Sequence, residues 1–175
     1  MGHSIPSTLN KELGALWINT AQGEIGQKEV RGAKANPRIL EYFKASKFWG
    51  EDDTGAKNAW CGSFAAWVLS KHGFIPPKNS FRAKAWLNFG KRLDKPAYGA
   101  LGIKTRTGGG HVSFIVGQSE DGATYYMLGG NQGDAVNVTK YPASVWSGFV
   151  FPTGAVSSDT VPTYDGVAAL AGSEA

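Results

Sequence analysis

Apolar residues recur along the first half of the chain at steps of three and four, and along the second half at every other position. Steps of three and four place residues on one face of a helix, whereas alternation places them on one face of a strand. Helices followed by a run of strands predict an α+β protein with N-terminal helices packed on an antiparallel β-sheet. The predicted helices centre on residues 9–21, 37–43, 60–69 and 81–89, and the predicted strands on residues 99–103, 111–117, 123–128, 135–139 and 148–151.

Capping residues mark where three of these helices should begin. Asn36 precedes Pro37, and this pair is typical of an N-cap followed by proline in the first helical turn. Asn58 is expected to cap the third helix, and Ser80 the fourth.

The composition fits one globular domain of 175 residues, with 24 glycines and a formal net charge of +4. Its charges form no block like a nucleic-acid-binding arm, and its apolar runs fall short of the roughly 18 residues that a membrane span needs. We therefore expect neither nucleic acid nor a membrane span. One cysteine and three dispersed histidines exclude an internal disulfide and offer no zinc cluster, so no metal or cofactor is expected.

The two ends of the chain differ in composition from the part between them. Residues 1–8 are polar and are expected to be disordered or foreign to the domain. The domain itself is predicted to span residues 9–152. Residues 153–175 are rich in Ser, Thr, Gly and Ala, which predicts a flexible tail or linker.

Cys61 is the single cysteine, and it falls in the first turn of the third predicted helix. The unpaired N–H groups and partial positive charge of a helix start favour the thiolate form, which prepares a nucleophile. Cys61 also shares one helix face with Phe64, Ala65 and Val68, so it can instead be a small core residue.

His111 follows the glycines at positions 108–110 and begins a predicted strand. A histidine beside a glycine run leaves room for a substrate to approach, and it could serve as a base. The alternative is an ordinary, partly buried histidine.

The segment between the second and third predicted strands decides which residue lies opposite His111. A three-residue hairpin loop at Glu120–Gly122, with its glycine left-handed, pairs Ser119 with Ala123. In that register Asn131 lies opposite His111, and its amide could hold the imidazole in one tautomer.

A shorter loop would change this assignment. With two loop residues the register shifts by one and Gln132 takes the place of Asn131, which makes Gln132 the alternative orienting residue. The segment that holds both can also be a plain turn, where Asn is common.

Four segments of the chain resemble the CHAP group of the NlpC/P60 superfamily, the papain-like cysteine amidohydrolases of bacterial cell walls. The resemblance extends over roughly residues 16–152, and within it the segments look like a subgroup found in phage lysins, prophages and bacterial secretion loci. The four segments, in chain order, are Asn36–Tyr42, Trp60–Val68, Gly110–Phe114 and Leu128–Gln132.

The resemblance implies a papain-like fold and a peptidoglycan amidase or endopeptidase, with Cys61 as nucleophile, His111 as base and Asn131 as third member. CHAP proteins often carry a Glu two residues before this Asn, and here Gly129 stands there. The oxyanion would be bound by the backbone N–H groups of Cys61 and its neighbour Gly62. A non-catalytic cell-wall or partner-binding module and a papain-like proteinase are the alternatives.

Charged and aromatic residues near the proposed nucleophile are candidates for substrate contact. Asp52 and Asp53 could bind a free amine of a stem peptide, and Arg106 a carboxylate; alternatively, all three are solvated loop charges. Trp60 could line the substrate groove or belong to the core.

The expected location and partners follow from the resemblance together with the N-terminal sequence. No cleaved secretion signal is recognised at the N-terminus. The protein is therefore expected to be made in the bacterial cytoplasm and to act in the periplasm or cell wall of a target cell, as an antibacterial effector or a lysin. The expected partners are peptidoglycan and, for an effector, an inhibitor protein that plugs the cleft.

Overall fold

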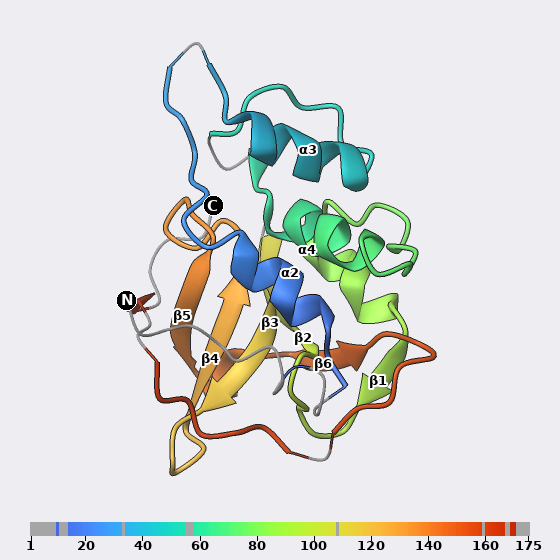
Figure 1. Ribbon diagram of the computed structural model, residues 1–175, viewed down its shortest axis with the longest axis vertical. Helices are drawn as coiled ribbons and strands as arrows, with labels where there is room; N and C mark the ends of the chain where they lie inside the picture. The colour runs from blue at the N-terminus through green and yellow to red at the C-terminus, as the bar shows by residue number, and fades with distance from the viewer. Residues whose placement is uncertain are drawn as a thin grey trace.

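The computed structural model describes residues 10, 14–32, 34–54, 58–107, 109–158, 160–166 and 169–170. Residues 1–8, which are expected to be disordered or foreign to the domain, lie outside these ranges. From residue 14 onward, the helix predicted over residues 9–21 begins only at Trp17, because Gly14 is left-handed with φ of 75°. Within them, helices come first and strands follow, with the helices on the sheet (Figure 1). The α+β class is therefore confirmed.

Three α-helices occupy the N-terminal part of the described chain: α2 (Trp17–Gly23), α3 (Pro37–Ala45) and α4 (Cys61–Ser70). The predicted cap of α3 is confirmed, because the Asn36 side chain accepts the N–H of Arg38 at 2.9 Å. The predicted cap of α4 is wrong. The amide of Asn58 instead donates to the carbonyl of Thr54, and the helix begins at Cys61.

The fourth predicted helix is a short 3-10 helix, η2 (Ala83–Asn88), and a second one, η3 (Ala143–Val145), precedes the last long strand. Ser80 does not cap η2. Its backbone carbonyl accepts the indole N–H of Trp86 at 2.8 Å, and η2 begins three residues later. The chain before η2 is thus held by the core rather than by a helix cap.

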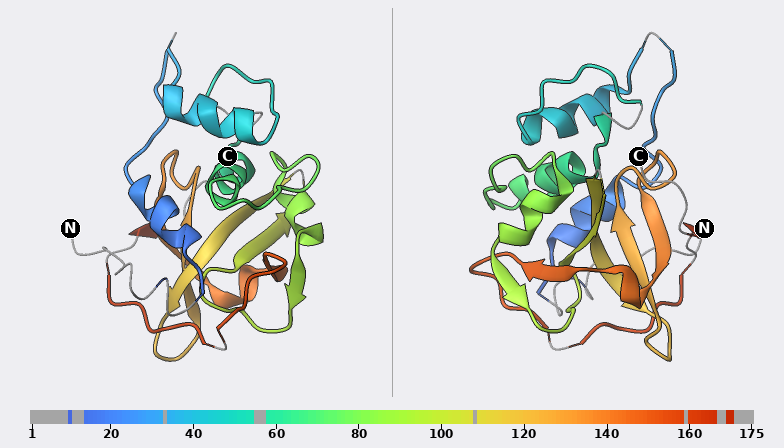
Figure 2. Two further views of the ribbon diagram at one scale, coloured as in Figure 1. Left: turned by 45° about the vertical axis from the view of Figure 1, so that its right-hand side comes forward. Right: turned by 180° about the vertical axis from the view of Figure 1, so that it is seen from behind.

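The described residues form a seven-stranded sheet in the order β1-β6-β2-β3-β4-β5-β7. Its neighbours pair antiparallel, except that β7 pairs parallel with β5. Figures 1 and 2 show β3 near the middle of the sheet. The strands are β1 (Lys91–Leu93), β2 (Leu101–Arg106), β3 (Gly109–Gln118), β4 (Thr124–Gly129), β5 (Asn137–Pro142), β6 (Gly148–Phe151) and β7 (Ala169–Leu170).

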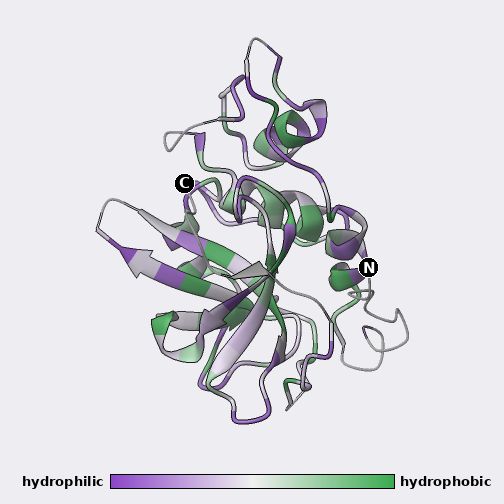
Figure 3. Cartoon of the chain, turned by 90° about the vertical axis from the view of Figure 1, so that its left-hand side faces the viewer, coloured by the Kyte–Doolittle hydropathy of each residue, from purple (hydrophilic) through white to green (hydrophobic). Residues whose placement is uncertain are grey.

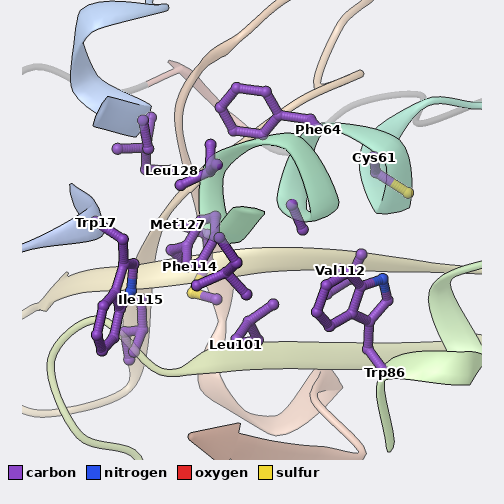
Figure 4. Close-up of a cluster of buried hydrophobic side chains, with 14 of the residues drawn as sticks. Trp17, Cys61, Phe64, Trp86, Leu101, Val112, Phe114, Ile115, Met127 and Leu128 are labelled. Atoms are coloured by element: carbon purple, nitrogen blue, oxygen red, sulfur yellow. The ribbon is translucent and has the colours of Figure 1, made fainter. Parts of the chain in front are cut away.

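Helix α4 lies between α3 and the sheet (Figure 1), and all its residues from Cys61 to Leu69 are buried. A helix enclosed by other elements must be apolar or small on every face, and this explains its sequence. Figure 3 shows hydrophobic residues concentrated where the helices meet the sheet. The core that α4 shares with the strands is drawn in Figure 4.

The hairpin between β3 and β4 differs from its prediction at the turn but not near the predicted site. Gly122 is left-handed as expected, yet Ser119 pairs with Thr124 rather than with Ala123. A β-bulge between Ile115 and Gly117 takes up the difference. Beyond the bulge the strands are paired in the predicted register, because a bulge adds one residue to one strand only.

The segment after Pro152 is attached to the sheet where the structure describes it. The backbone of Gln118 accepts the N–H of Tyr164 at 2.9 Å and donates to the carbonyl of Pro162 at 3.0 Å. Tyr164 also stacks on Tyr126, with ring centroids 4.5 Å apart. The composition predicts a flexible tail because the segment has few apolar residues. In the structure, backbone hydrogen bonds and one aromatic pair instead hold the described part of this segment against the sheet.

Candidate active site

Cys61 is the first residue of α4 and is 3% exposed. It is one of the residues that line a cavity of about 1120 Å³. In Figure 4 its sulfur points away from Phe64, on the side of the cluster where Val112 and Trp86 lie. The thiol therefore combines a helix N-terminus with an open space large enough for a substrate.

Gly62 explains how the chain can form a cavity wall directly beside the start of α4. A Cβ atom at this position would lie 2.2 Å from the carbonyl oxygen of Ser80 and 3.0 Å from the backbone of Phe81. Only glycine allows this crossing without a shift of the backbone. The residue after Cys61 is thus small because another segment passes over it.

The tip of the β2–β3 hairpin forms another part of the cavity wall. Arg106, Gly109 and Gly110 line the same cavity as Cys61. His111 follows directly in β3 and is fully buried. The hairpin therefore brings the candidate base to the edge of the cavity that holds the candidate nucleophile.

The imidazole of His111 is held by a hydrogen bond and two aromatic rings. Its Nε2 lies 2.9 Å from Oε1 of Gln132. The ring centroids of Tyr141 and Trp146 lie 5.9 Å and 6.4 Å from that of His111. These contacts fix the plane of the imidazole within the sheet.

Gln132 also determines which nitrogen of His111 carries the proton. Its Nε2 faces the carbonyls of Met127 and Asn137, at 3.1 and 2.9 Å, and Oδ1 of Asn137 at 3.1 Å. An amide nitrogen must donate to these acceptors, so Oε1 is the atom that faces His111. It can only accept, and the neutral imidazole therefore carries its proton on Nε2 and its lone pair on Nδ1.

The hydrogen bond at Nε2 of His111 is made by Gln132, the residue that the sequence offers as the alternative to Asn131. Strand β4 ends at Gly129, and Asn131 is left-handed with φ of 57°. Alternation along a strand no longer decides the direction of a side chain once the chain has turned. The predicted register therefore holds within β4, but β4 ends before Gln132, and strand pairing does not place that side chain.

Two of the predicted substrate-binding residues lie elsewhere. Asp53 is fully buried, and its Oδ2 accepts the backbone N–H groups of Val30 and Asn36 at 3.0 and 2.8 Å. Asp52 is exposed and accepts the N–H and hydroxyl of Thr54, which lower its pKa. Both carboxylates organise their own loop, which corrects the expectation that they bind an amine of the substrate.

Trp60 belongs to the core, which settles its two alternatives. It is fully buried, its ring stacks on Tyr42 with centroids 5.9 Å apart, and its indole N–H donates to Oε1 of Glu29 at 2.9 Å. It supports the start of α4 from the side and does not line the cavity.

Glu29 provides a prediction about stability, because burial raises the pKa of its carboxyl group. A pKa raised by folding means that stability is complete at low pH and falls as pH rises through the folded-state value. Glu29→Gln keeps an acceptor for Trp60 and removes the charge. We expect thermal unfolding to show a higher Tm for this variant at pH 7 and no gain at about pH 4.

The matched control for this prediction is Glu120→Gln, which removes an exposed glutamate from the β3–β4 loop. It should leave the Tm unchanged at both pH values. A lower Tm for Glu29→Gln at pH 7 would mean that the charge itself strengthens the bond to Trp60.

The sequence did not single out a group of three aromatic residues on the cavity. Phe48, Trp49 and Phe81, here called the aromatic wall, all line the cavity, and Trp49 is 77% exposed. The ring centroids are 5.0 Å apart for Phe48 and Trp49, 5.3 Å for Phe48 and Phe81, and 5.8 Å for Trp49 and Phe81. The adjacent residues Phe48 and Trp49, which precede a polar loop, are the feature of the sequence that could have indicated this group.

Comparisons with known proteins add no identification: no family model, no curated protein and no solved structure matches this chain. Among the described residues, His, Cys, Asp and Glu form no group of three or more suited to hold a metal ion. In the same part of the chain, no helix combines the length and apolar character that crossing a bilayer demands.

Proposed function

We propose that this protein is a cysteine-dependent amidohydrolase that cleaves an amide bond of bacterial peptidoglycan. The observation that carries the proposal is the meeting of two features at one cavity. Cys61 begins a helix and lines the cavity, and the β3 end that carries His111 forms part of its wall. The four-segment resemblance to cell-wall amidohydrolases supplies the substrate class.

The proposed reaction begins with transfer of the thiol proton of Cys61 to Nδ1 of His111. The thiolate then attacks the amide carbonyl, and the first backbone N–H groups of α4, at Cys61 and Gly62, bind the oxyanion. The imidazolium gives its proton to the leaving amine as the C–N bond breaks. Water next attacks the thioester, His111 removes its proton, and the C–S bond breaks to release the acid and restore the thiol.

In this mechanism Gln132 keeps Nδ1 as the reacting nitrogen, because its Oε1 binds Nε2–H throughout.

Peptidoglycan lies outside the cytoplasm. A protein that cleaves it therefore acts in the periplasm or cell wall.

The test is digestion of purified sacculi, followed by mass spectrometry of the soluble fragments. We expect the wild type to release fragments with new amine and carboxyl ends, and the mass of the ends identifies the bond. A parallel incubation with an unfolded protein separates the proteinase alternative. Cleavage of the unfolded protein alone, or binding to sacculi without cleavage, would contradict the proposal.

Gln132→Ala tests the positioning role of Gln132. We expect kcat to fall about 100-fold with KM little changed, because the imidazole loses its fixed tautomer while the cavity is kept. Gln132→Glu should restore part of the rate and move the acid limb of the pH profile upward, because a carboxylate at this place favours the imidazolium. Both effects are measured by sacculus turnover over a pH series.

The matched control is Asn131→Gly, which removes the neighbouring side chain and tolerates the left-handed backbone. It should keep more activity than Gln132→Ala. The reverse order of effects would return the orienting role to Asn131.

A further inference from the structure

The cavity beside Cys61 is aromatic on one side. The aromatic wall joins three rings, and the most exposed of them, Trp49, is 77% exposed at the cavity. Single exposed apolar side chains are common on proteins, but contiguous groups of them at a cavity indicate a binding surface. The indole offers one broad face with a negative quadrupole, on which polarised C–H groups can pack.

The cavity is also basic. Lys78, Arg82 and Lys84 line it, and no Asp or Glu is among the described residues that do so. The described residues form two ion pairs, and both involve Arg38. Within that part of the chain, therefore, no carboxylate neutralises Lys78, Arg82 or Lys84. Such a lining favours ligands that carry negative charge.

One residue joins the aromatic and basic parts. Arg82 is exposed, and its guanidinium carbon lies 5.6 Å from the ring centroid of Phe81, so a cation stands beside the aromatic wall. A ligand that packs on the wall therefore finds a partner for an acidic group within reach. A planar guanidinium suits a carboxylate better than an ammonium does, because it can bind both oxygens.

We propose that this cavity is a subsite for a saccharide joined to an acidic peptide, with the sugar ring packed on Trp49 and a carboxylate of the attached peptide bound by Arg82. The identity of the saccharide rests on the proposed function. In peptidoglycan it is the lactyl-bearing sugar with its attached peptide, and the bond cleaved is then the amide that joins this sugar to the first amino acid. A stem peptide without sugar leaves the aromatic wall uncovered.

The volume agrees with a ligand of this size. About 1120 Å³ exceeds the range of roughly 300–1,000 Å³ that is usual for small-molecule sites, and it accommodates a sugar together with several amino acids. A single-stranded nucleic acid also combines rings with negative charge. It offers no amide of the kind a thiolate cleaves, and this favours the saccharide.

The test is calorimetric binding to the full-length Cys61→Ala protein, which cannot turn over its ligand. Four probes are compared: N-acetylmuramoyl dipeptide, the same dipeptide without sugar, a neutral N-acetylglucosamine oligomer and a short single-stranded oligonucleotide. We expect the muramoyl dipeptide to bind most tightly, about tenfold better than the free dipeptide, which corresponds to about 1.4 kcal/mol.

Two further substitutions in the same background locate the binding. Trp49→Ala should weaken binding of the muramoyl dipeptide about tenfold, whereas Ile75→Ala, which removes a side chain that is 86% exposed and does not line the cavity, should not. Arg82→Gln should weaken the same ligand, and Lys95→Gln, the charge-matched control outside the cavity, should not.

Equal binding of the free dipeptide, equal effects of Trp49→Ala and Ile75→Ala, or tighter binding of the oligonucleotide would each overturn the saccharide subsite. These outcomes concern binding alone. Failure of the wild type to cleave sacculi would instead overturn the proposed function, so the two failures are distinguishable.

Discussion

The Cys61→Ala variant is expected to release no detectable fragments from sacculi, a loss of roughly four orders of magnitude or more. The reason is chemical: alanine has no atom that can form the thioester, and water alone reacts far more slowly with an amide. Fragment release is measured by mass spectrometry over a time course, at equal concentrations of variant and wild type.

The fold should survive this substitution, because the lost sulfur borders a cavity, so that its removal leaves most of the packing of α4 in place. Circular dichroism and thermal unfolding provide the check. Cys61→Ser is the matched control for size, and it should be nearly as inactive, since a serine hydroxyl has a far higher pKa than a thiol and forms little alkoxide beside a neutral histidine. Retained cleavage in a folded Cys61→Ala protein would remove Cys61 from the mechanism.

Removal of the His111 imidazole is expected to have the second largest effect, a loss of roughly three orders of magnitude or more in sacculus cleavage. Without this group the thiol of Cys61 loses its proton acceptor and the leaving amine loses its proton donor. His111 is fully buried and hydrogen-bonded to Gln132, so His111→Ala can lose stability as well as activity.

A second measurement separates these two effects. His111→Asn keeps a polar side chain of similar length, and the rate of alkylation of Cys61 by iodoacetamide reports its thiolate without any substrate. In the wild type we expect rapid alkylation well below pH 8, because an ion pair with imidazolium favours the thiolate. In His111→Asn the rate should rise only near the ordinary thiol pKa of about 8.5. Identical pH profiles would show that His111 does not act on Cys61.

The α+β class, the longer strands and the cap of α3 could be predicted from the sequence because each depends on local pattern. Alternation of apolar residues reports which face of a strand is buried, and Asn36-Pro37 sets a helix start by its own backbone preferences. Strands β1 and β7 have three and two residues, too few for any period to be recognised. They exist because longer neighbours offer unpaired backbone groups.

The position of Cys61 at a helix start was predictable for the same local reason, although the helix begins at Cys61 itself and not at Asn58. Local pattern restricts the partner of His111 to Asn131 or Gln132, but it does not choose between them. The choice depends on a turn after β4 in which a left-handed Asn131 redirects the chain, and on an Asn137 side chain that holds the Gln132 amide. The direction of the Gln132 side chain is thus determined by tertiary contacts, and the pattern of residues along the chain does not predict these contacts.

Under the proposed function, the crossing of Ser80 and Phe81 over Gly62 ties substrate recognition to reactivity. Phe81 belongs to the aromatic wall, and the backbone of Ser80 and Phe81 touches the first turn of α4, which begins with the proposed nucleophile Cys61. A bulky ligand that displaces Phe81 would thus press on the helix turn whose N–H groups are proposed to bind the oxyanion, because closely packed backbones transmit displacement. Engineering this protein toward larger substrates should therefore alter turnover together with selectivity, and libraries that vary residue 81 need to be screened for both.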